Sequence, residues 1–171
     1  MDITLQKADI SDIPALDDIC RAAAKTPGST WDDEYPNTEI LTQDAQIGTL
    51  FKIMADGKTA GLLMLGKGGE LSVLDDASDG AHPFDFARFG IHPQYQGAGV
   101  GSRALALALD FARTCGASCV RILVSPTNPA ALAVYRKAGF EEIRPVHLWE
   151  QDYLYIRKML SGSAESPCIG A

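Results

Sequence analysis

The stretch Gln94–Ser102, which reads Gln-Tyr-Gln-Gly-Ala-Gly-Val-Gly-Ser, decides the fold of this chain. It lies between an extended segment at Phe86–Ile91 and an alanine- and leucine-rich helix that we expect to begin near Val100. Three alternating glycines leave the start of that helix bare of side chains. Its first backbone N–H groups have no partner within the helix, so they can bind an anion with the help of the helix dipole. The stretch therefore predicts a phosphate-binding turn between a strand and a helix.

Two common phosphate-binding motifs fit this stretch poorly. A Walker P-loop needs a lysine and then a serine or threonine after its last glycine, whereas Gly101 is followed by Ser102 and Arg103. A dinucleotide fingerprint needs its third glycine where Ser102 stands, and an acidic residue about 20 positions further on. The chain has Val120–Ile122 in that region. An NAD(P)-dependent oxidoreductase is therefore an alternative that the motif does not favour.

The composition is that of one globular domain, with 46% hydrophobic and 22% charged residues among 171. We expect this domain at residues 1–160 and a disordered tail at residues 161–171, which are mostly small or polar. The net charge of −7 argues against nonspecific nucleic-acid binding and mildly favours a cationic substrate. The cysteines have no metal-ligand spacing to one another or to a histidine, so we expect no metal site.

The apolar segments of the chain bear on its location. No apolar run approaches the ~18 residues of a membrane span, and Met1–Gln6 lacks the basic start and apolar stretch of a signal peptide. We therefore expect a cytoplasmic protein that does not enter a membrane. The sequence leaves open whether the chain forms a homodimer.

Strand-like and helix-like segments alternate along the chain and predict an α/β (α+β) domain. Alternating or continuous apolar runs predict strands, and spaced apolar residues with caps predict helices. The expected strands are Ile3–Lys7, Leu50–Ala55, Thr59–Lys67, Phe84–Ile91, Cys119–Ser125, Phe140–His147 and Asp152–Met159. We expect them to form a mixed, mostly antiparallel sheet of six or seven strands flanked by helices. The polar, glycine-rich segment Gly68–His82 is compatible with a short strand or a mobile insertion.

A second motif lies downstream, at Asn128–Phe140, which reads Asn-Pro-Ala-Ala-Leu-Ala-Val-Tyr-Arg-Lys-Ala-Gly-Phe. It resembles the N-x-x-A-x-x-x-Y-x-K-x-G-F signature of the GNAT superfamily of N-acetyltransferases. The spacing Gln94-x-x-Gly97-x-Gly99 resembles the acyl-CoA pyrophosphate loop of the same superfamily. The two motifs occur in the family's order, with one helix and one strand between them. The resemblance implies a single GNAT-like domain that uses acetyl-CoA and whose sheet splays beside the strand ending near Ile91.

The resemblance also implies which residues hold the cofactor. Backbone amides of the glycine-rich turn would bind the CoA pyrophosphate, and the preceding strand would pair with the pantetheine arm. Asn128 is explained locally as a helix N-cap, and in the family the matching residue also reaches the pantetheine arm. The implied cofactor-binding residues are Phe89, Ile91, Gln96, Gly97, Ala98, Gly99, Val100, Gly101, Ser102 and Asn128.

Three residues are candidates for the chemistry. The resemblance implies that Tyr135 protonates the departing thiolate; as a plain core aromatic it would need only a hydroxyl partner. The attacking amine arrives as an ammonium and must lose a proton. Asp85 is the first candidate base, because strand alternation puts it on the same face as Phe89 and Ile91, and it resembles in position the acidic base of some members. It can equally be a solvent-exposed carboxylate at a strand start. His82 is the second candidate, since histidine titrates nearest to neutral pH.

The loop after the first helix is the expected acceptor wall. In related enzymes this loop borders the acceptor cleft, and here it contains Trp31, Glu34 and Tyr35 beside two further acids. An aromatic ring with neighbouring carboxylates suits a cationic amine. The same residues are also compatible with an ordinary solvated acidic loop.

The resulting hypothesis is transfer of acetyl from the CoA thioester to a primary amine of a small molecule or peptide. The amine would attack directly, without a metal or a covalent enzyme intermediate. The alternative from another class is a non-catalytic acyl-CoA-binding sensor or interaction domain. Retention of both Tyr135 and Asp85 favours the enzyme.

Overall fold

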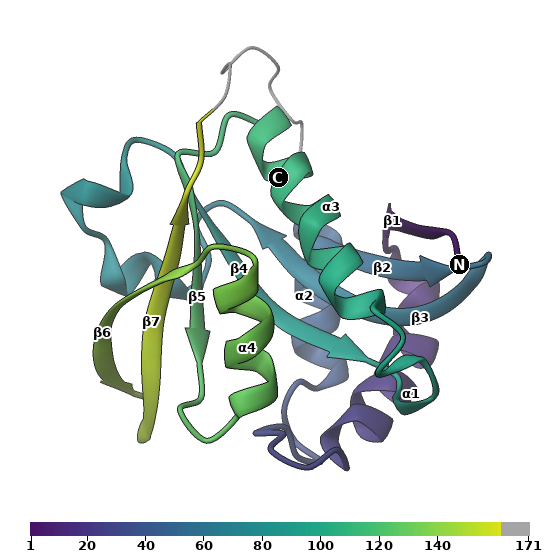
Figure 1. The fold of residues 1–171 in the computed structure, drawn as a ribbon. Helices are drawn as coiled ribbons and strands as arrows, with labels where there is room; N and C mark the ends of the chain where they lie inside the picture. The colour runs from purple at the N-terminus through teal and green to yellow at the C-terminus, as the bar shows by residue number, and fades with distance from the viewer. Residues whose placement is uncertain (162–171) are drawn as a thin grey trace.

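The fold is a seven-stranded mixed sheet with helices on both faces, seen in a computed structural model that describes residues 1–161 (Figure 1). The tail expected at residues 161–171 lies, from residue 162 onward, outside the described residues. The strands, in the order β1-β2-β3-β4-β5-β7-β6, are β1 (Ile3–Lys7), β2 (Leu50–Ala55), β3 (Lys58–Gly66), β4 (Pro83–Ile91), β5 (Cys119–Val124), β7 (Gln151–Met159) and β6 (Glu141–Leu148). All neighbours are antiparallel except β4 and β5. The predicted fold class is confirmed.

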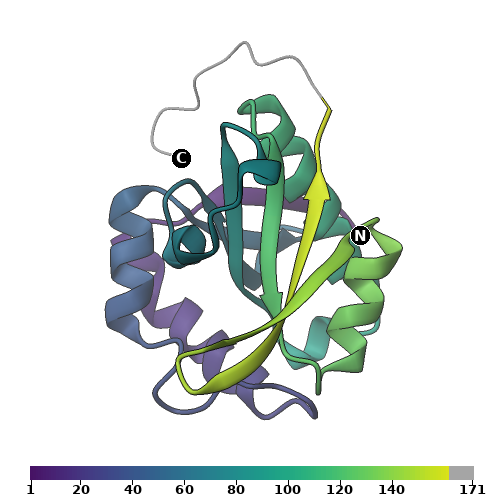
Figure 2. The ribbon, with the colours of Figure 1, turned by 90° about the vertical axis from the view of Figure 1, so that its left-hand side faces the viewer.

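Four α-helices cover the two faces of the sheet. They are α1 (Ile13–Ala24), α2 (Thr38–Ile47), α3 (Val100–Thr114) and α4 (Pro129–Lys137). Helices α3 and α4 cover one face, in front in Figure 1, and α1 and α2 cover the other (Figures 1 and 2). Two separate apolar clusters follow this division: Ala104 and Ala108 of α3 pack with Phe86, whereas Leu16 and Leu41 pack on the opposite face.

The sheet opens between β4 and β5. These strands pair only from Pro83–Asp85 to Cys119–Arg121. Beyond Asp85 the strands separate, while β5 continues its pairing with β7. Backbone groups of Phe86–Ile91 that face β5 therefore have no strand partner and are available to an extended ligand. This confirms the predicted splay beside the strand that ends at Ile91.

A β-bulge interrupts the alternation of side chains along β4. Leu62 pairs with Gly90 but Met64 pairs with Ala87, so β4 carries one extra residue, and Arg88 has a positive φ of 48°. A bulge of this kind places two successive side chains on one face. The rings of Phe86 and Phe89 meet on the α3 face, with centroids 5.2 Å apart. Ala87 and Arg88 therefore share the opposite face. Side chains at odd-numbered positions before the bulge lie on the opposite face from side chains at odd-numbered positions after it.

The segment between β3 and β4, for which the sequence left two alternatives open, forms two short 3-10 helices. These are η2 (Glu70–Leu74) and η3 (Ala77–Asp79). The buried guanidinium of Arg121 on β5 holds them against the sheet: its Nη1 lies 2.8 Å from Asp75 and 3.1 Å from Asp79. Tyr155 of β7 also donates a hydrogen bond to Asp79, at 2.8 Å. The segment is thus fixed by charge pairs over β4, β5 and β7.

Candidate functional site

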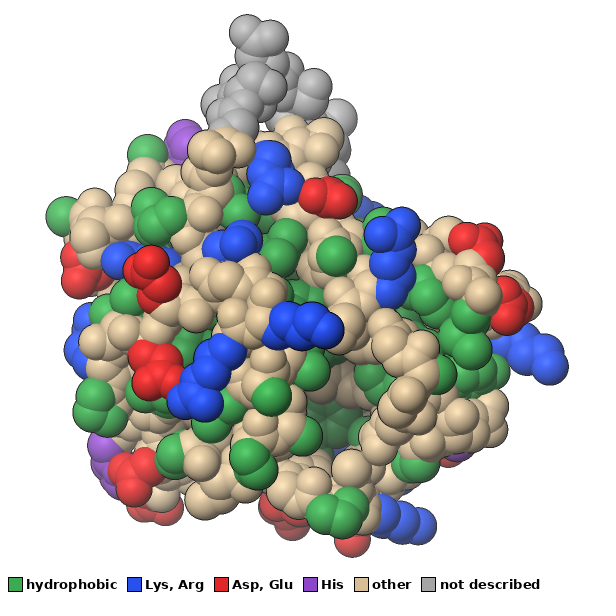
Figure 3. All heavy atoms as spheres, in the orientation of Figure 1, with side chains coloured by type: hydrophobic (Ala, Val, Ile, Leu, Met, Phe, Trp, Pro, Cys, Tyr) green, Lys and Arg blue, Asp and Glu red, His purple; other side chains and the backbone are tan. Residues whose placement is uncertain are grey.

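A cavity of about 520 Å³ lies at the splay of the sheet. It is bordered by the end of β4, the start of α3, one side of α4 and the loop that follows α1. Figure 3 shows the hollow between α4 and the loop before α3. Of the predicted cofactor residues, the lining includes Phe89, Ile91, Gln96, Gly97, Gly99, Val100, Gly101, Ser102 and Asn128. Ala98 belongs to the same loop but is not part of the lining.

The glycine-rich turn leaves the N-terminus of α3 open to this cavity. Gly99 is the N-cap of α3, with a φ of 79° and no side chain to cap the helix. A Cβ atom added to Gly97 or Gly99 would meet nothing within 4 Å, so both positions face open space. The first N–H groups of α3 are therefore free to bind an anion, as the sequence predicted for a bare helix terminus.

Gln96, which the sequence analysis names among the cofactor-binding residues for its backbone amide, also has side-chain contacts that the sequence did not predict. The spacing Gln-x-x-Gly-x-Gly occurs twice, from Gln94 and again from Gln96, and the start of α3 at Val100 puts the second copy at the helix terminus. Gln94 does not line the cavity. The Gln96 side-chain amide donates hydrogen bonds to the Ile91 carbonyl, at 2.9 Å, and to Thr26 Oγ1, at 3.2 Å.

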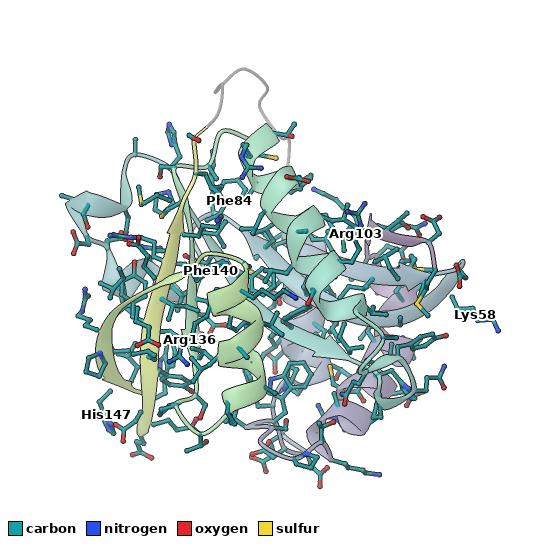
Figure 4. The ribbon with its side chains drawn as sticks, in the orientation of Figure 1. Lys58, Phe84, Arg103, Arg136, Phe140 and His147 are labelled. Atoms are coloured by element: carbon teal, nitrogen blue, oxygen red, sulfur yellow. The ribbon has the colours of Figure 1, made fainter. Side chains whose placement is uncertain are left out.

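Tyr135 lies on α4 with its ring in an aromatic cluster. The ring centroids of Phe140, Phe86 and Phe89 are 5.7, 6.4 and 6.5 Å away, and Phe140 follows the end of α4 (Figure 4). Tyr135 lines the cavity, and its hydroxyl has no hydrogen-bond partner among the described residues. Burial raises the pKa of Tyr135 above that of an ordinary tyrosine. The side chain therefore keeps its proton at neutral pH and can act as a donor.

Asn128 has the local role that the sequence predicts. Its side-chain oxygen accepts a hydrogen bond from the backbone N–H of Ala131 at 3.1 Å, as an N-cap of α4 should. It also lines the cavity and lies beside the loop after α1, since a Cβ atom on Gly28 would be 3.6 Å from Asn128 Oδ1. A contact to the cofactor stays a prediction.

The expectation that Asp85 shares a sheet face with Phe89 and Ile91 is wrong, because the bulge at Ala87–Arg88 shifts the alternation. Asp85 is fully buried on the opposite face, where its Oδ1 lies 2.8 Å from Arg121 Nη2. Burial raises the pKa of Asp85, although the charge of Arg121 opposes that rise. The carboxylate does not line the cavity, so this geometry does not support it as the base.

We predict that Asp85→Asn lowers stability and leaves chemistry nearly intact. Breaking a buried ion pair costs about 3–5 kcal/mol because the remaining charge is left unpaired. The free energy of unfolding should fall by that order, while kcat of the folded protein stays within about twofold, since Asp85 does not line the cavity. Urea denaturation and steady-state rates below both melting temperatures measure the two effects. A loss of about 100-fold in kcat without a loss of stability would instead support Asp85 as the general base.

His82 is not brought to the cavity either. It is exposed at the residue before β4 begins, while the cavity borders the other end of that strand at Phe89–Ile91. Its backbone N–H donates to Ser118 Oγ at 3.1 Å, which ties it to the loop before β5. The expected role of His82 as a base therefore has no support from its position.

The structure separates the three expected acceptor residues. Trp31 lines the cavity, and its ring lies directly over Gly90, where a Cβ atom would be 2.5 Å from Trp31 Cη2. Tyr35 is outside the lining; its hydroxyl accepts a hydrogen bond from Arg88 Nη1 at 3.3 Å. Glu34 is exposed on the loop, with its backbone N–H bonded to Asp32 at 2.8 Å. Trp31 is thus the one of the three that borders the cavity.

Within residues 1–161, no group of three or more His, Cys, Asp or Glu side chains is arranged to hold a metal ion. No helix in that part of the chain has the length and apolar character needed to cross a membrane.

Comparison with known proteins supplies the family. The sequence profile described as "Acetyltransferase (GNAT) family" matches residues 16–140. Among curated proteins, the N-alpha-acetyltransferase RimI of Mycobacterium tuberculosis is 43% identical over 63 residues, which are 36% of this chain and 38% of that protein. The matched region is therefore well under half the length of this curated relative.

Two solved structures have the same fold. A GNAT-family acetyltransferase from Streptococcus agalactiae has a TM-score of 0.77 and 20% identity, and the alignment covers 93% of this chain and 96% of that chain. The PaiA N-acetyltransferase from Thermoplasma acidophilum, solved in complex with coenzyme A, has a TM-score of 0.71 and 19% identity, over 94% of this chain and 100% of that chain. At such identities the likeness concerns the fold. Since the family profile spans most of the sequence, from α1 through α4, the chain belongs to the acetyltransferase (GNAT) family.

Proposed function

We propose that this chain binds acetyl-CoA in the cavity at the splay and transfers the acetyl group to a primary amine of a small molecule or peptide. Membership of the acetyltransferase family supports the cofactor. The observation that carries the proposal is that one cavity contains both the bare N-terminus of α3 and the unpartnered hydroxyl of Tyr135. An anion-binding terminus and a proton donor are what a CoA thioester and its departing thiolate require.

The residues of the cavity can bind an elongated, partly anionic ligand along its length. The N–H groups at Gly99–Ser102 suit the pyrophosphate, because the helix dipole favours negative charge there. The unpaired backbone of Phe89–Ile91 suits an arm that hydrogen-bonds like a strand. Bound acetyl-CoA supplies a thioester carbonyl that an amine can attack directly. Residues of Phe89–Ile91 then offer backbone N–H groups that stabilise developing negative charge on that carbonyl oxygen.

Two proton movements complete the reaction. Tyr135 is the general acid: its raised pKa keeps it protonated until negative charge develops on the leaving sulfur. The acceptor ammonium must lose a proton before it attacks. None of the described residues that line the cavity is Asp, Glu or His, so we assign this proton to water held by polar groups such as Ser29 and Thr30. No carboxylate or imidazole base is required in this scheme.

A thiol-release assay tests the proposed function. Acetyl-CoA is mixed with the chain and a panel of primary amines, and free CoA thiol is followed over time. We expect amine-dependent release, with acetylated amine formed in equal amount. Tight CoA binding without release on any amine would instead favour the non-catalytic acyl-CoA sensor. Stabilisation of the fold by NAD(P) but not by CoA would favour an oxidoreductase.

The remaining expectations about partners are also proposals. We propose a cytoplasmic location and no nucleic-acid partner, in keeping with the net charge of −7. Light scattering after size-exclusion chromatography tests whether the chain forms a homodimer.

A further inference from the structure

The indole ring of Trp31 lies against the backbone of Gly90 on β4. A Cβ atom added at Gly90 would lie 2.5 Å from Cη2 and 2.6 Å from Cζ3 of the ring, closer than side-chain atoms approach one another. Glycine permits such an approach because it leaves the backbone uncovered. Gly90 is buried, and Trp31 packs with Leu62 on the face of the sheet that α1 and α2 cover. The six-membered end of the indole therefore forms part of the cavity wall at Gly90.

The backbone around Trp31 is held by hydrogen bonds on both sides of the residue. The Trp31 N–H donates to Ser29 Oγ at 3.1 Å. The guanidinium of Arg21 on α1 donates to the carbonyls of Asp32 and Pro36, which follow the tryptophan in the chain. The indole thus has a fixed position, and a large ring anchored in this way limits the space in front of it.

Gly90 belongs to the stretch of β4 that the proposed reaction uses. In that reaction the thioester carbonyl accepts a hydrogen bond from a backbone N–H of Phe89–Ile91, where β4 has no strand partner on the side of β5. The Phe89 ring lies on the same face as Tyr135, with centroids 6.5 Å apart, whereas Gly90 faces Trp31. A thioester on this stretch therefore has Tyr135 on one face of the sheet and Trp31 on the other.

The three substituents of a thioester carbonyl carbon lie in one plane. In the proposed reaction the oxygen is directed at the backbone N–H, and the sulfur at Tyr135, which protonates it as it leaves. The third substituent, the alkyl part of the acyl group, then points away from Tyr135 and towards the face of Gly90 and Trp31. Acetyl has a single methyl group there, and each further methylene would extend towards the indole.

We propose that Trp31 limits the length of the acyl group, so that the site takes acetyl or propionyl and excludes longer acyl chains. The absence of a side chain at Gly90 is what lets the ring reach this position. This assignment rests on the proposed acetyl transfer, and it moves Trp31 from the expected acceptor wall to the wall of the acyl group.

The test measures kcat/KM for acetyl-CoA and hexanoyl-CoA with one accepted amine. In the unmodified chain we expect acetyl-CoA to be favoured by more than about 100-fold, since each methylene that a pocket does not accommodate costs roughly 10-fold or more. Trp31→Ala should reduce this preference to about tenfold or less, through a gain of activity with hexanoyl-CoA, and Trp31→Phe should give an intermediate preference. Trp149→Ala is the matched control: Trp149 is exposed and does not line the cavity, so the full preference should remain.

The contact between the ring and the strand is tested by Gly90→Ala. The added methyl group would overlap the indole, so the melting temperature should fall by roughly 2–10 °C in the unmodified chain. In the Trp31→Ala chain the same substitution should have a much smaller effect, because the overlapping ring is absent. Equal losses in the two chains overturn this position of the ring.

A preference for acetyl-CoA that survives Trp31→Ala, or equal rates with both donors in the unmodified chain, overturns the assignment. A change in the amine KM of Trp31→Ala with the donor preference intact also overturns it, because the ring would then border the acceptor. Unfolding does not imitate the expected result, since that result is a gain of activity with the longer donor.

Calorimetric affinities for the two thioesters, measured without an amine, separate this assignment from the proposed function. A preference in affinity that depends on Trp31, with no thiol release on any amine, supports the acyl wall and overturns the enzyme. Amine-dependent release from acetyl-CoA with no dependence of donor preference on Trp31 supports the enzyme and overturns the acyl wall.

Discussion

Tyr135→Phe is expected to lower kcat by about 10- to 10⁴-fold, the range for loss of a general acid. The change removes one hydroxyl and little packing, because the ring keeps its contacts with Phe86, Phe89 and Phe140. Affinity for acetyl-CoA should change far less, since the proton matters when charge develops on the leaving sulfur. Steady-state kinetics with any accepted amine, together with CoA binding by calorimetry, measure the two effects.

Tyr95→Phe is the matched control, because Tyr95 also lines the cavity and loses the same atom. Its kcat should stay within about twofold of the unmodified chain. Since burial raises the pKa of Tyr135, deprotonation of this group should reduce kcat only above about pH 10, the ordinary range of tyrosine. If instead Tyr135→Phe keeps full turnover, Tyr135 is a core aromatic and its hydroxyl takes no part in the chemistry. Pre-steady-state measurement shows whether chemistry or product release limits the rate.

Gly99→Glu is expected to weaken binding of CoA by more than about 100-fold. The new carboxylate would stand at the N-terminus of α3, where the pyrophosphate needs the bare N–H groups, and like charges in a binding site cost several kcal/mol. The fold should survive, because a Cβ atom at Gly99 meets no neighbour within 4 Å. Calorimetry gives the affinity, and circular dichroism gives the melting temperature.

Gly57→Glu is the control for the stability that a protein loses when a residue with a side chain replaces a glycine of positive φ. Gly57 in the β2–β3 turn has the same φ of 79° as Gly99 and equally open surroundings, but it is not part of the cavity. Both variants should therefore lose similar stability, about 1–2 kcal/mol for a side chain in the left-handed region. Only Gly99→Glu should lose CoA affinity. Normal affinity in a folded Gly99→Glu protein would place the cofactor elsewhere.

The part of the candidate site around the glycine turn could be predicted from sequence because its backbone geometry depends on local features. Alternating glycines before an amphipathic helix, and Asn-Pro at the start of the next one, determine their own backbone geometry. The parallel pairing of β4 and β5 ends after Asp85, and Phe89, Gly99 and Tyr135 border one cavity. The role proposed for Tyr135 comes from the family resemblance, because spacing alone does not indicate it.

The arrangement on the other face of β4 could not be predicted, because it depends on contacts between distant segments. A single extra residue in β4 moved Asp85 to the opposite face, and no glycine or proline marks the bulge at Ala87–Arg88. Arg88 meets Glu70, Asp44 and Tyr35 only in the folded chain. The sequence identified the acidic residues of the loop after α1, but it could not show which distant side chains contact them. The position of an ionised side chain is determined by its partner, and here the partners are far apart along the chain.

The extra residue in β4 has a consequence for how such a chain can evolve. It puts Phe89 on the face of β4 that borders the glycine turn and α4, and Arg88 on the opposite face, beside Asp44 and Glu70. Substitutions around Arg88 do not touch the glycine turn, which lies beside Phe89 and Ile91 at Gly101. In the proposed enzyme, acceptor specificity can therefore change under selection while the proposed cofactor site stays constant. A chain built in this way can acquire a new recipient through a few surface changes and keep the same donor.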